Sequence, residues 1–231
     1  GYIAAKYRIF EQQKPGGIAI VGVDDADCYK LFEKLTAEHS GEVVPISSAD
    51  ATEGGIYASG PDLIDATGVT PQQVCSLEGI NTLPGAHNGQ NAAAAYLVCK
   101  SVGVPRDDIA ECMSTYPGLP HRQQLAAVVD GVSYVNDSKA TNDAAAARAL
   151  ACFNNVYWIL GGRPKKVDLA ACMPHLNRVR HAYLIGEAAV AFSRVLDGKV
   201  PFTLSGELDA AVVAAHEQAL ADGLPQPIVA L

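Results

Sequence analysis

"VSYVNDSKATNDAAAARALACFNNVYWILGG", residues 132–162, is the stretch that decides the fold. The apolar run 132–135 predicts a buried strand, the alanine-rich run 143–153 a helix, and the run 156–160 a second buried strand. A strand, a helix and a strand in this order predict a right-handed crossover between parallel strands. The alternation continues along the chain, with helices expected at 167–175, 187–196 and 208–222 and strands at 181–185, 200–204 and from 227. We therefore predict an α/β fold built on a mostly parallel, doubly wound sheet.

The loop between the first strand and helix is rich in polar residues, namely Asn136, Asp137, Ser138, Lys139, Thr141 and Asn142. In doubly wound sheets, ligands bind outside the carboxyl ends of the strands, where loops lead into helix N-termini that favour anions. The next such loop, "LGGRPKKVD" at 160–168, adds Arg163, Lys165 and Lys166. Either loop alone is explained as well by a helix cap or a Gly-Gly turn. Two of them on successive strands favour an anion-binding edge.

The first half of the chain has a less regular pattern. We expect a helix within 2–17, a strand beginning at Ile18, a helix at 27–39, short strands and turns, some of them antiparallel, over 41–86, and helices at 87–101 and 105–116. Pro117, Gly118 and Pro120 then interrupt the pattern. We therefore place a domain boundary here, between a domain at 1–117 and a domain at 118–231.

The composition of the chain disfavours several classes of function. The chain has 231 residues, 49% of them hydrophobic, with a net charge of −8 and no run of Lys or Arg, which disfavours a nucleic-acid surface. Its six cysteines form no C-x-x-C pair, as expected of reduced thiols in the cytoplasm. No apolar segment reaches the roughly 20 residues that cross a bilayer, and the first residues do not have the layout of a signal peptide. We expect a cytoplasmic protein that binds small molecules.

Five segments give the sequence a family resemblance: "AAKYRIF" (4–10), "HNGQNAAAA" (87–95), "GLPHR" (118–122), "NDSKATN" (136–142) and "LGGRPK" (160–165). In this order they resemble the Mur ligase family, and within it the members that add D-glutamate to UDP-N-acetylmuramoyl-L-alanine. "NDSKATN" is the most diagnostic of the five, because relatives that add other amino acids differ there. Two residues depart from the pattern: Gly22, where the family usually has Asn, and Arg163, where some members have Asp.

The resemblance implies an architecture and a reaction. Residues 1–117 would be the C-terminal part of a central ATP-binding domain, and residues 118–231 most of a C-terminal Rossmann-like domain that binds the incoming amino acid, with its last strand and helix truncated. Such ligases use ATP and Mg²⁺ in peptidoglycan precursor synthesis to convert a carboxylate into an acyl phosphate, which D-glutamate attacks. The sequence contains no G-x-x-G-K-[ST] phosphate-binding loop. We therefore expect a ligase fragment, inactive as given and monomeric.

The resemblance also implies roles for residues that would bind the nucleotide. Asn88 and Asn91 would hold the adenine through amides that both donate and accept hydrogen bonds. Arg122, beside His121, would bind the phosphates with its planar fork, and Asp137 would accept from the ribose hydroxyls. Without the resemblance, Asn88 reads as a helix cap and Arg122 as a surface arginine.

Four further residues would serve the amino acid and the metal. Lys139, Thr141 and Lys165 would surround D-glutamate, since two cations and a hydroxyl match its two carboxylates, and Lys139 would also take part in catalysis. Lys6 would be carbamylated in the intact enzyme, which turns a cation into an oxygen-bearing anion able to bind Mg²⁺ directly or through water. Without the resemblance, all three lysines read as solvated surface residues.

Two alternatives remain at this stage. A non-catalytic module that binds a nucleotide or an amino acid could use the same sheet. A Rossmann dehydrogenase domain is disfavoured because no G-x-G-x-x-G follows any expected strand.

Overall fold

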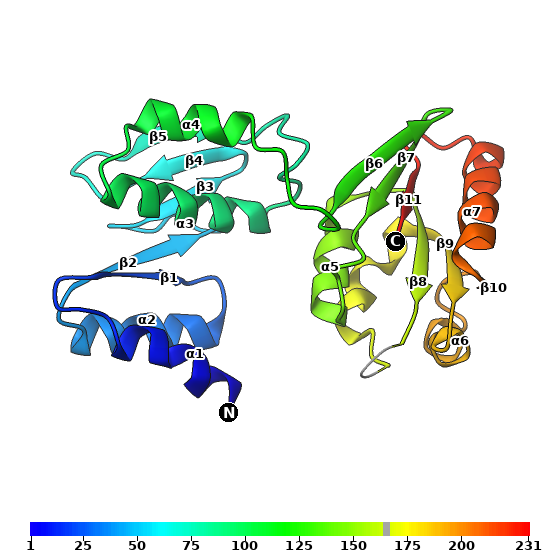
Figure 1. The fold of residues 1–231 in the computed structure, drawn as a ribbon, viewed down its shortest axis with the longest axis horizontal. Coiled ribbons are helices and arrows are strands. Elements are labelled where there is room, and N and C mark those ends of the chain that lie inside the picture. Colours follow the sequence, from blue (N-terminus) through cyan, green and yellow to red (C-terminus); the bar gives the residue numbers. More distant parts are fainter. Residues whose placement is uncertain (164–166) are drawn as a thin grey trace. The chain divides into compact units, whose positions relative to one another are not determined.

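The computed structural model describes residues 1–163 and 167–231, which form two compact units, Gly1–Tyr116 and Pro117–Leu231 (Figure 1). Each unit has its own sheet and its own hydrophobic core. The predicted α/β class is therefore confirmed. The chain passes from the first unit to the second at the Pro-Gly-Leu-Pro run that begins at Pro117. The two prolines of this run have no backbone N–H to donate in a helix or strand.

The first unit contains a five-stranded sheet in the order β1-β2-β3-β4-β5. Its strands are β1 (Ile18–Gly22), β2 (Glu42–Ser47), β3 (Ile56–Ser59), β4 (Asp62–Asp65) and β5 (Gln72–Ser76). The first three are parallel, and β3, β4 and β5 pair antiparallel. The antiparallel pattern expected over 41–86 is thus correct for β3 to β5 and wrong for β2, which pairs parallel with both neighbours.

Four helices cover the two faces of this sheet: α1 (Tyr2–Glu11), α2 (Ala26–Glu38), α3 (His87–Ser101) and α4 (Arg106–Ser114) (Figure 1). Successive residues of a strand point to opposite faces, so Ala19 and Val21 of β1 pack against the side of α1 and α2. Ile18 and Ile20 pack on the other face, in the cluster that includes Ala93 of α3. Both faces of β1 are therefore covered, as in parallel sheets generally.

The second unit contains a six-stranded sheet in the order β10-β9-β8-β11-β7-β6. Its elements are β6 (Gln124–Val129), β7 (Val132–Asn136), α5 (Asp143–Cys152), β8 (Val156–Gly161), the 3₁₀ helix η1 (Ala170–Arg178), β9 (Val179–Ile185), α6 (Ala189–Leu196), β10 (Phe202–Gly206), α7 (Leu208–Asp222) and β11 (Ile228–Ala230). All strands except β6 are parallel. This arrangement confirms the mostly parallel, doubly wound sheet.

Two elements of this unit differ from the expectation. The helix expected at 167–175 is a 3₁₀ helix at Ala170–Arg178, with Pro174 inside it. Strand β6 was not foreseen, because all its residues are exposed and the sequence shows no buried face there. It joins β7 through Asp130 and Gly131, whose φ values of 51° and 81° are those of a type I′ hairpin turn.

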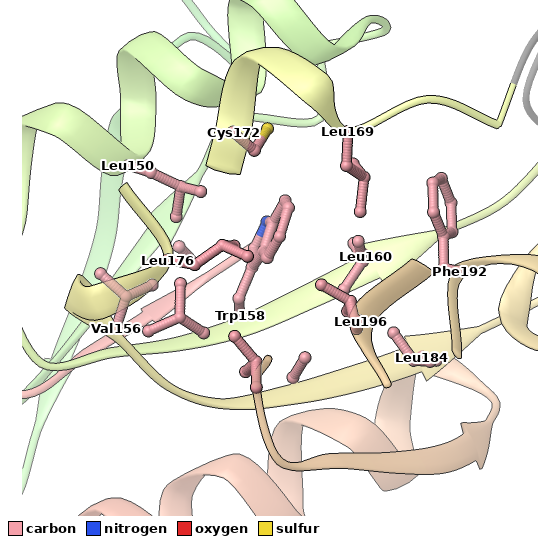
Figure 2. Packing of buried hydrophobic residues seen from close by; sticks show 14 of the residues in the cluster. Leu150, Val156, Trp158, Leu160, Leu169, Cys172, Leu176, Leu184, Phe192 and Leu196 are labelled. Carbon is pink, nitrogen blue, oxygen red and sulfur yellow. The ribbon is translucent and has the colours of Figure 1, made fainter. Parts of the chain in front are cut away.

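The core of the second unit lies on both sides of β8. Trp158 and Leu160 point to the face covered by α5, η1 and α6, and Figure 2 shows Trp158 amid Leu150, Leu160 and Leu176. Tyr157 and Ile159 point to the opposite face, against α7. A strand buried on both sides reads as one continuous apolar run, which is why this strand could be recognised in the sequence.

Candidate functional site

The carboxyl ends of β7, β8 and β9 lie at one edge of the second sheet, because these strands are parallel. The loop after β7, residues 136–142, is called the polar loop below. The loops after β8 and β9 are joined by their backbones: Gly162 N–H donates to Ile185 O at 3.2 Å, and Ala188 N–H donates to Gly162 O at 3.2 Å. The loops after β8 and β9 therefore form a continuous rim.

Hydrogen bonds within the polar loop fix its backbone. Asn136 Oδ1 accepts from Ser138 N–H at 3.1 Å, and Asp137 O accepts from Ala140 N–H at 2.7 Å. Asn142 is the N-cap of α5 and accepts from Ala145 N–H at 2.9 Å. The cap interpretation is thus correct for Asn142. It does not account for Lys139 or Thr141, whose exposed side chains leave the loop free to contact a ligand.

A turn at residues 119–123 packs against the polar loop. His121 O accepts from Lys139 N–H at 3.1 Å, and His121 Nδ1 lies 3.1 Å from Asn136 Nδ2. Gln123 N–H donates to an oxygen of Asp137 at 3.1 Å. The tertiary structure thereby brings the predicted residues His121, Asp137 and Lys139 together.

The backbone of this turn is strained at two positions. His121 has φ 63° and Gln123 has φ 45°, values in the left-handed region that non-glycine residues rarely adopt. Such strain persists where surrounding contacts hold it, and here the contacts are those to the polar loop. Arg122 lies between the two strained residues, and its side chain is exposed. The sequence offered no signal for Gln123, since its contribution comes from the main chain.

The carboxyl of Asp137 is half-buried. Burial raises its pKa, while the N–H of Gln123 and the charge of Arg122 act in the opposite direction. Arg122 belongs to the turn whose Gln123 N–H donates to this carboxyl. The second carboxyl oxygen has no hydrogen-bond partner within residues 1–163 and 167–231. Asp137 therefore keeps an acceptor for a hydroxyl group.

The loop after β8 has a close backbone approach and an ion pair. A Cβ added to Gly161 would lie 1.9 Å from Ile185 O, so only glycine fits there. Arg163 makes a two-pronged ion pair with Glu187, at 3.1 Å and 2.8 Å. Arg163 was expected to present positive charge in this loop, and in the structure that charge is paired with Glu187, which sequence reasoning missed. Glu187 could have been found by extending the carboxyl-end rule to β9.

The lysines of the same loop, Lys165 and Lys166, lie outside the described residues. Their expected contacts remain a prediction.

The two predicted amides of the first unit lie in the first two turns of α3. Asn88 Nδ2 donates to Pro84 O at 2.7 Å, and Asn91 Nδ2 donates to Asn88 Oδ1 at 3.0 Å. The N-cap of α3 is Ala86, so the alternative in which Asn88 caps the helix is wrong. The structure brings both amides together near the carboxyl ends of β1 and β2, since Gln90 between them contacts the loop after β1.

Lys6 lies on α1, on the opposite face of the sheet from α3, and its side chain is exposed (Figure 1). Within the described ranges, no three His, Cys, Asp or Glu side chains are grouped so that they could hold a metal ion. The described side chains therefore do not form a magnesium site by themselves. The part of the chain that the structure describes also contains no helix that could cross a membrane.

Comparison with known proteins agrees with this arrangement. Residues 1–99 match the Mur ligase middle domain. This match and the relatives below confirm the resemblance to the Mur ligase family in the sequence. Two relatives that match the whole chain are called UDP-N-acetylmuramoylalanine–D-glutamate ligase: that of Rhodospirillum rubrum is 47% identical and that of Paramagnetospirillum magneticum 44%. The chain spans 48% and 50% of their lengths, or about half.

Solved structures share the fold. The bifunctional folylpolyglutamate synthase/dihydrofolate synthase of Yersinia pestis aligns with 93% of this chain and 50% of its own, at a TM-score of 0.57 and 20% identity. The UDP-N-acetylmuramate–alanine ligase of Thermotoga maritima aligns with 90% of this chain and 51% of its own, at a TM-score of 0.51 and 13% identity. At these identities the similarity concerns the fold alone.

Proposed function

We propose that this chain supplies the adenine-binding and amino-acid-binding parts of an ATP-dependent ligase that adds D-glutamate to UDP-N-acetylmuramoyl-L-alanine. One observation carries the proposal: the 119–123 turn is hydrogen-bonded to the polar loop, so that Arg122, Asp137 and Lys139 gather at the carboxyl edge of a parallel sheet. The substrates in this proposal are inferred from the names of the relatives.

The reaction needs an activated carboxylate, because a carboxylate is a poor electrophile. ATP supplies the phosphoryl group, and the amine of D-glutamate displaces phosphate to form the amide. Positioning and neutralisation of charge dominate such transfers. In this proposal Arg122 binds phosphate oxygens with its fork, and the free oxygen of Asp137 accepts from a ribose hydroxyl. Asn88 and Asn91 hold the adenine through their amides.

The amino acid would bind at the same edge. The backbone N–H of Lys139 donates to His121 O, and its side chain is exposed. The ammonium group of Lys139 would bind a carboxylate of D-glutamate and would stabilise the negative charge that develops when the amine attacks. Thr141 would donate its hydroxyl to the second carboxylate, together with Lys165. Lys6 would act as a carbamate that contacts Mg²⁺, which prefers oxygen ligands.

The test is a chimera in which this chain replaces the aligned half of the Rhodospirillum rubrum ligase. ADP formation should depend on both UDP-N-acetylmuramoyl-L-alanine and D-glutamate, and L-glutamate should not substitute. The same chimera with Arg122→Ala should fold and be inactive. A folded chimera that forms no ADP, or that prefers another amino acid, would refute the proposal.

A further inference from the structure

The first turn of α3 approaches the sheet at two places where no additional side-chain carbon fits. A Cβ added to Gly89 would lie 2.5 Å from Cβ of Ala58 on β3. A Cβ added to Gly22, the last residue of β1, would lie 2.7 Å from Nε2 and 2.9 Å from Cδ of Gln90. Both distances are far below ordinary van der Waals contact. At Gly89 a larger residue would push the helix away from β3, and at Gly22 it would displace the end of the Gln90 side chain.

The side chain of Gln90 occupies the space above Gly22 and ends in a hydrogen-bond network. Its Nε2 donates to Asp24 Oδ2 at 2.9 Å and lies 3.5 Å from Ile46 O. The same oxygen of Asp24 accepts from Ser48 N–H at 2.8 Å and from Ser48 Oγ at 2.6 Å. Hydrogen bonds to a carboxylate are stronger than those between neutral groups. Gln90 therefore ties the first turn of α3 to the loops after β1 and β2.

This anchor lies between the two amides expected to bind adenine. Asn88 precedes Gln90 by two residues, Asn91 follows it directly, and the two asparagines are hydrogen-bonded to each other. Recognition of a base by amides depends on the orientation of each donor and acceptor, and a preorganised pair loses less entropy on binding. A fixed first turn of α3 supplies that orientation.

We propose that Gln90 is a positioning residue for Asn88 and Asn91, and that Gly22 provides the space in which Gln90 acts. This inference rests on the proposed function, because it requires that the two asparagines bind adenine. Gln90 acts through α3, with its own amide committed to Asp24.

The experiment is a titration of the 231-residue chain with adenosine, followed by NMR of the side-chain amides of Asn88 and Asn91. Gln90→Ala and Gly22→Ala should each weaken binding about five- to tenfold, the effect of one hydrogen bond. The double variant should bind no more weakly than either single variant, because a Cβ at position 22 displaces the same side chain that Gln90→Ala removes. Additive losses would overturn the pairing of the two residues.

Three controls separate positioning from general destabilisation. Gln73→Ala removes an exposed glutamine of β5, and Gly68→Ala adds a Cβ whose nearest neighbour is 4.0 Å away, so both should bind as wild type. Ala95→Gly lowers helix propensity at an exposed site of α3. The preference for adenosine over inosine should fall in Gln90→Ala and persist in Ala95→Gly, because only the former misorients the amides.

The outcomes distinguish this inference from the proposed function. If the wild type binds adenosine and Gln90→Ala binds equally well, the inference is overturned and the nucleotide assignment stands. If adenosine leaves the signals of Asn88 and Asn91 unchanged in the wild-type chain, the nucleotide assignment and the inference are both overturned.

Discussion

Protonation of Asp65 should weaken the attachment of α3 to the first sheet. Asp65, at the end of β4, accepts from Tyr96 Oη at 2.8 Å and Lys100 Nζ at 2.6 Å, both on α3, and from Thr67 N–H at 3.0 Å and Thr67 Oγ1 at 2.6 Å. Burial raises the pKa of Asp65, but the hydrogen bonds from Lys100, Thr67 and Tyr96 outweigh it and lower the pKa from 3.8 to about 2.

A pKa that falls from 3.8 to about 2 on folding corresponds to about 2.4 kcal/mol of stability. The Lys100 side chain is 42% exposed, so solvent screening reduces this to about 1–2 kcal/mol. The folded-state pKa is the lower one. The contribution is therefore complete above pH 4 and disappears as the pH falls through about 2.

The test compares the Asp65→Asn variant with the wild type by measuring the free energy of unfolding in urea at pH 7 and at pH 2. The single tryptophan, Trp158, belongs to the second unit, so its fluorescence serves as an internal control, while NMR signals of α3 report the first unit. At pH 7 the first unit should lose about 1–2 kcal/mol, with no change at Trp158. At pH 2 the variant and the wild type should unfold at nearly the same urea concentration.

A matched control is Asp62→Asn on the same strand, which should change stability by less than about 0.5 kcal/mol because that carboxylate makes no hydrogen bond in the described structure. The reasoning fails if Asp65→Asn unfolds like the wild type at pH 7, or if its deficit is as large at pH 2 as at pH 7.

Three further predictions concern the site. Gly161→Ala should destabilise the second unit by about 2–4 kcal/mol, seen as an earlier fluorescence transition, because the added Cβ meets a backbone oxygen at 1.9 Å; an unchanged transition would contradict the close approach. In the chimera, Thr141→Ala and Lys165→Ala should each raise the KM for D-glutamate about tenfold or more and leave the KM for ATP nearly unchanged; the reverse pattern would show that the loop assignments are wrong. Lys6→Ala in the chimera should abolish ligation, with partial recovery on addition of acetate, and full activity without acetate would rule out the carbamate.

Local sequence patterns were sufficient to predict most helices and strands of the second unit. The apolar run of β8 and the alanine-rich α5 could be predicted because burial on both faces of a parallel strand, and alanine's high helix propensity, leave signals within a few residues. The polar loop could be located for the same reason, since it lies between two recognisable elements. Strand β6 could not, because an exposed edge strand exists through its pairing with β7 and has no buried face.

The site itself depended on contacts between residues far apart in the sequence. Gln123 holds Asp137 through a main-chain N–H, which no side-chain pattern encodes. Glu187 neutralises Arg163 only because β8 and β9 are neighbours in the sheet. The space for Gln90 comes from Gly22 on another element. The sequence alone determined which local elements form and where polar groups gather. The tertiary structure decided which of those groups face one another, because sheet order and helix docking set distances that no local periodicity contains.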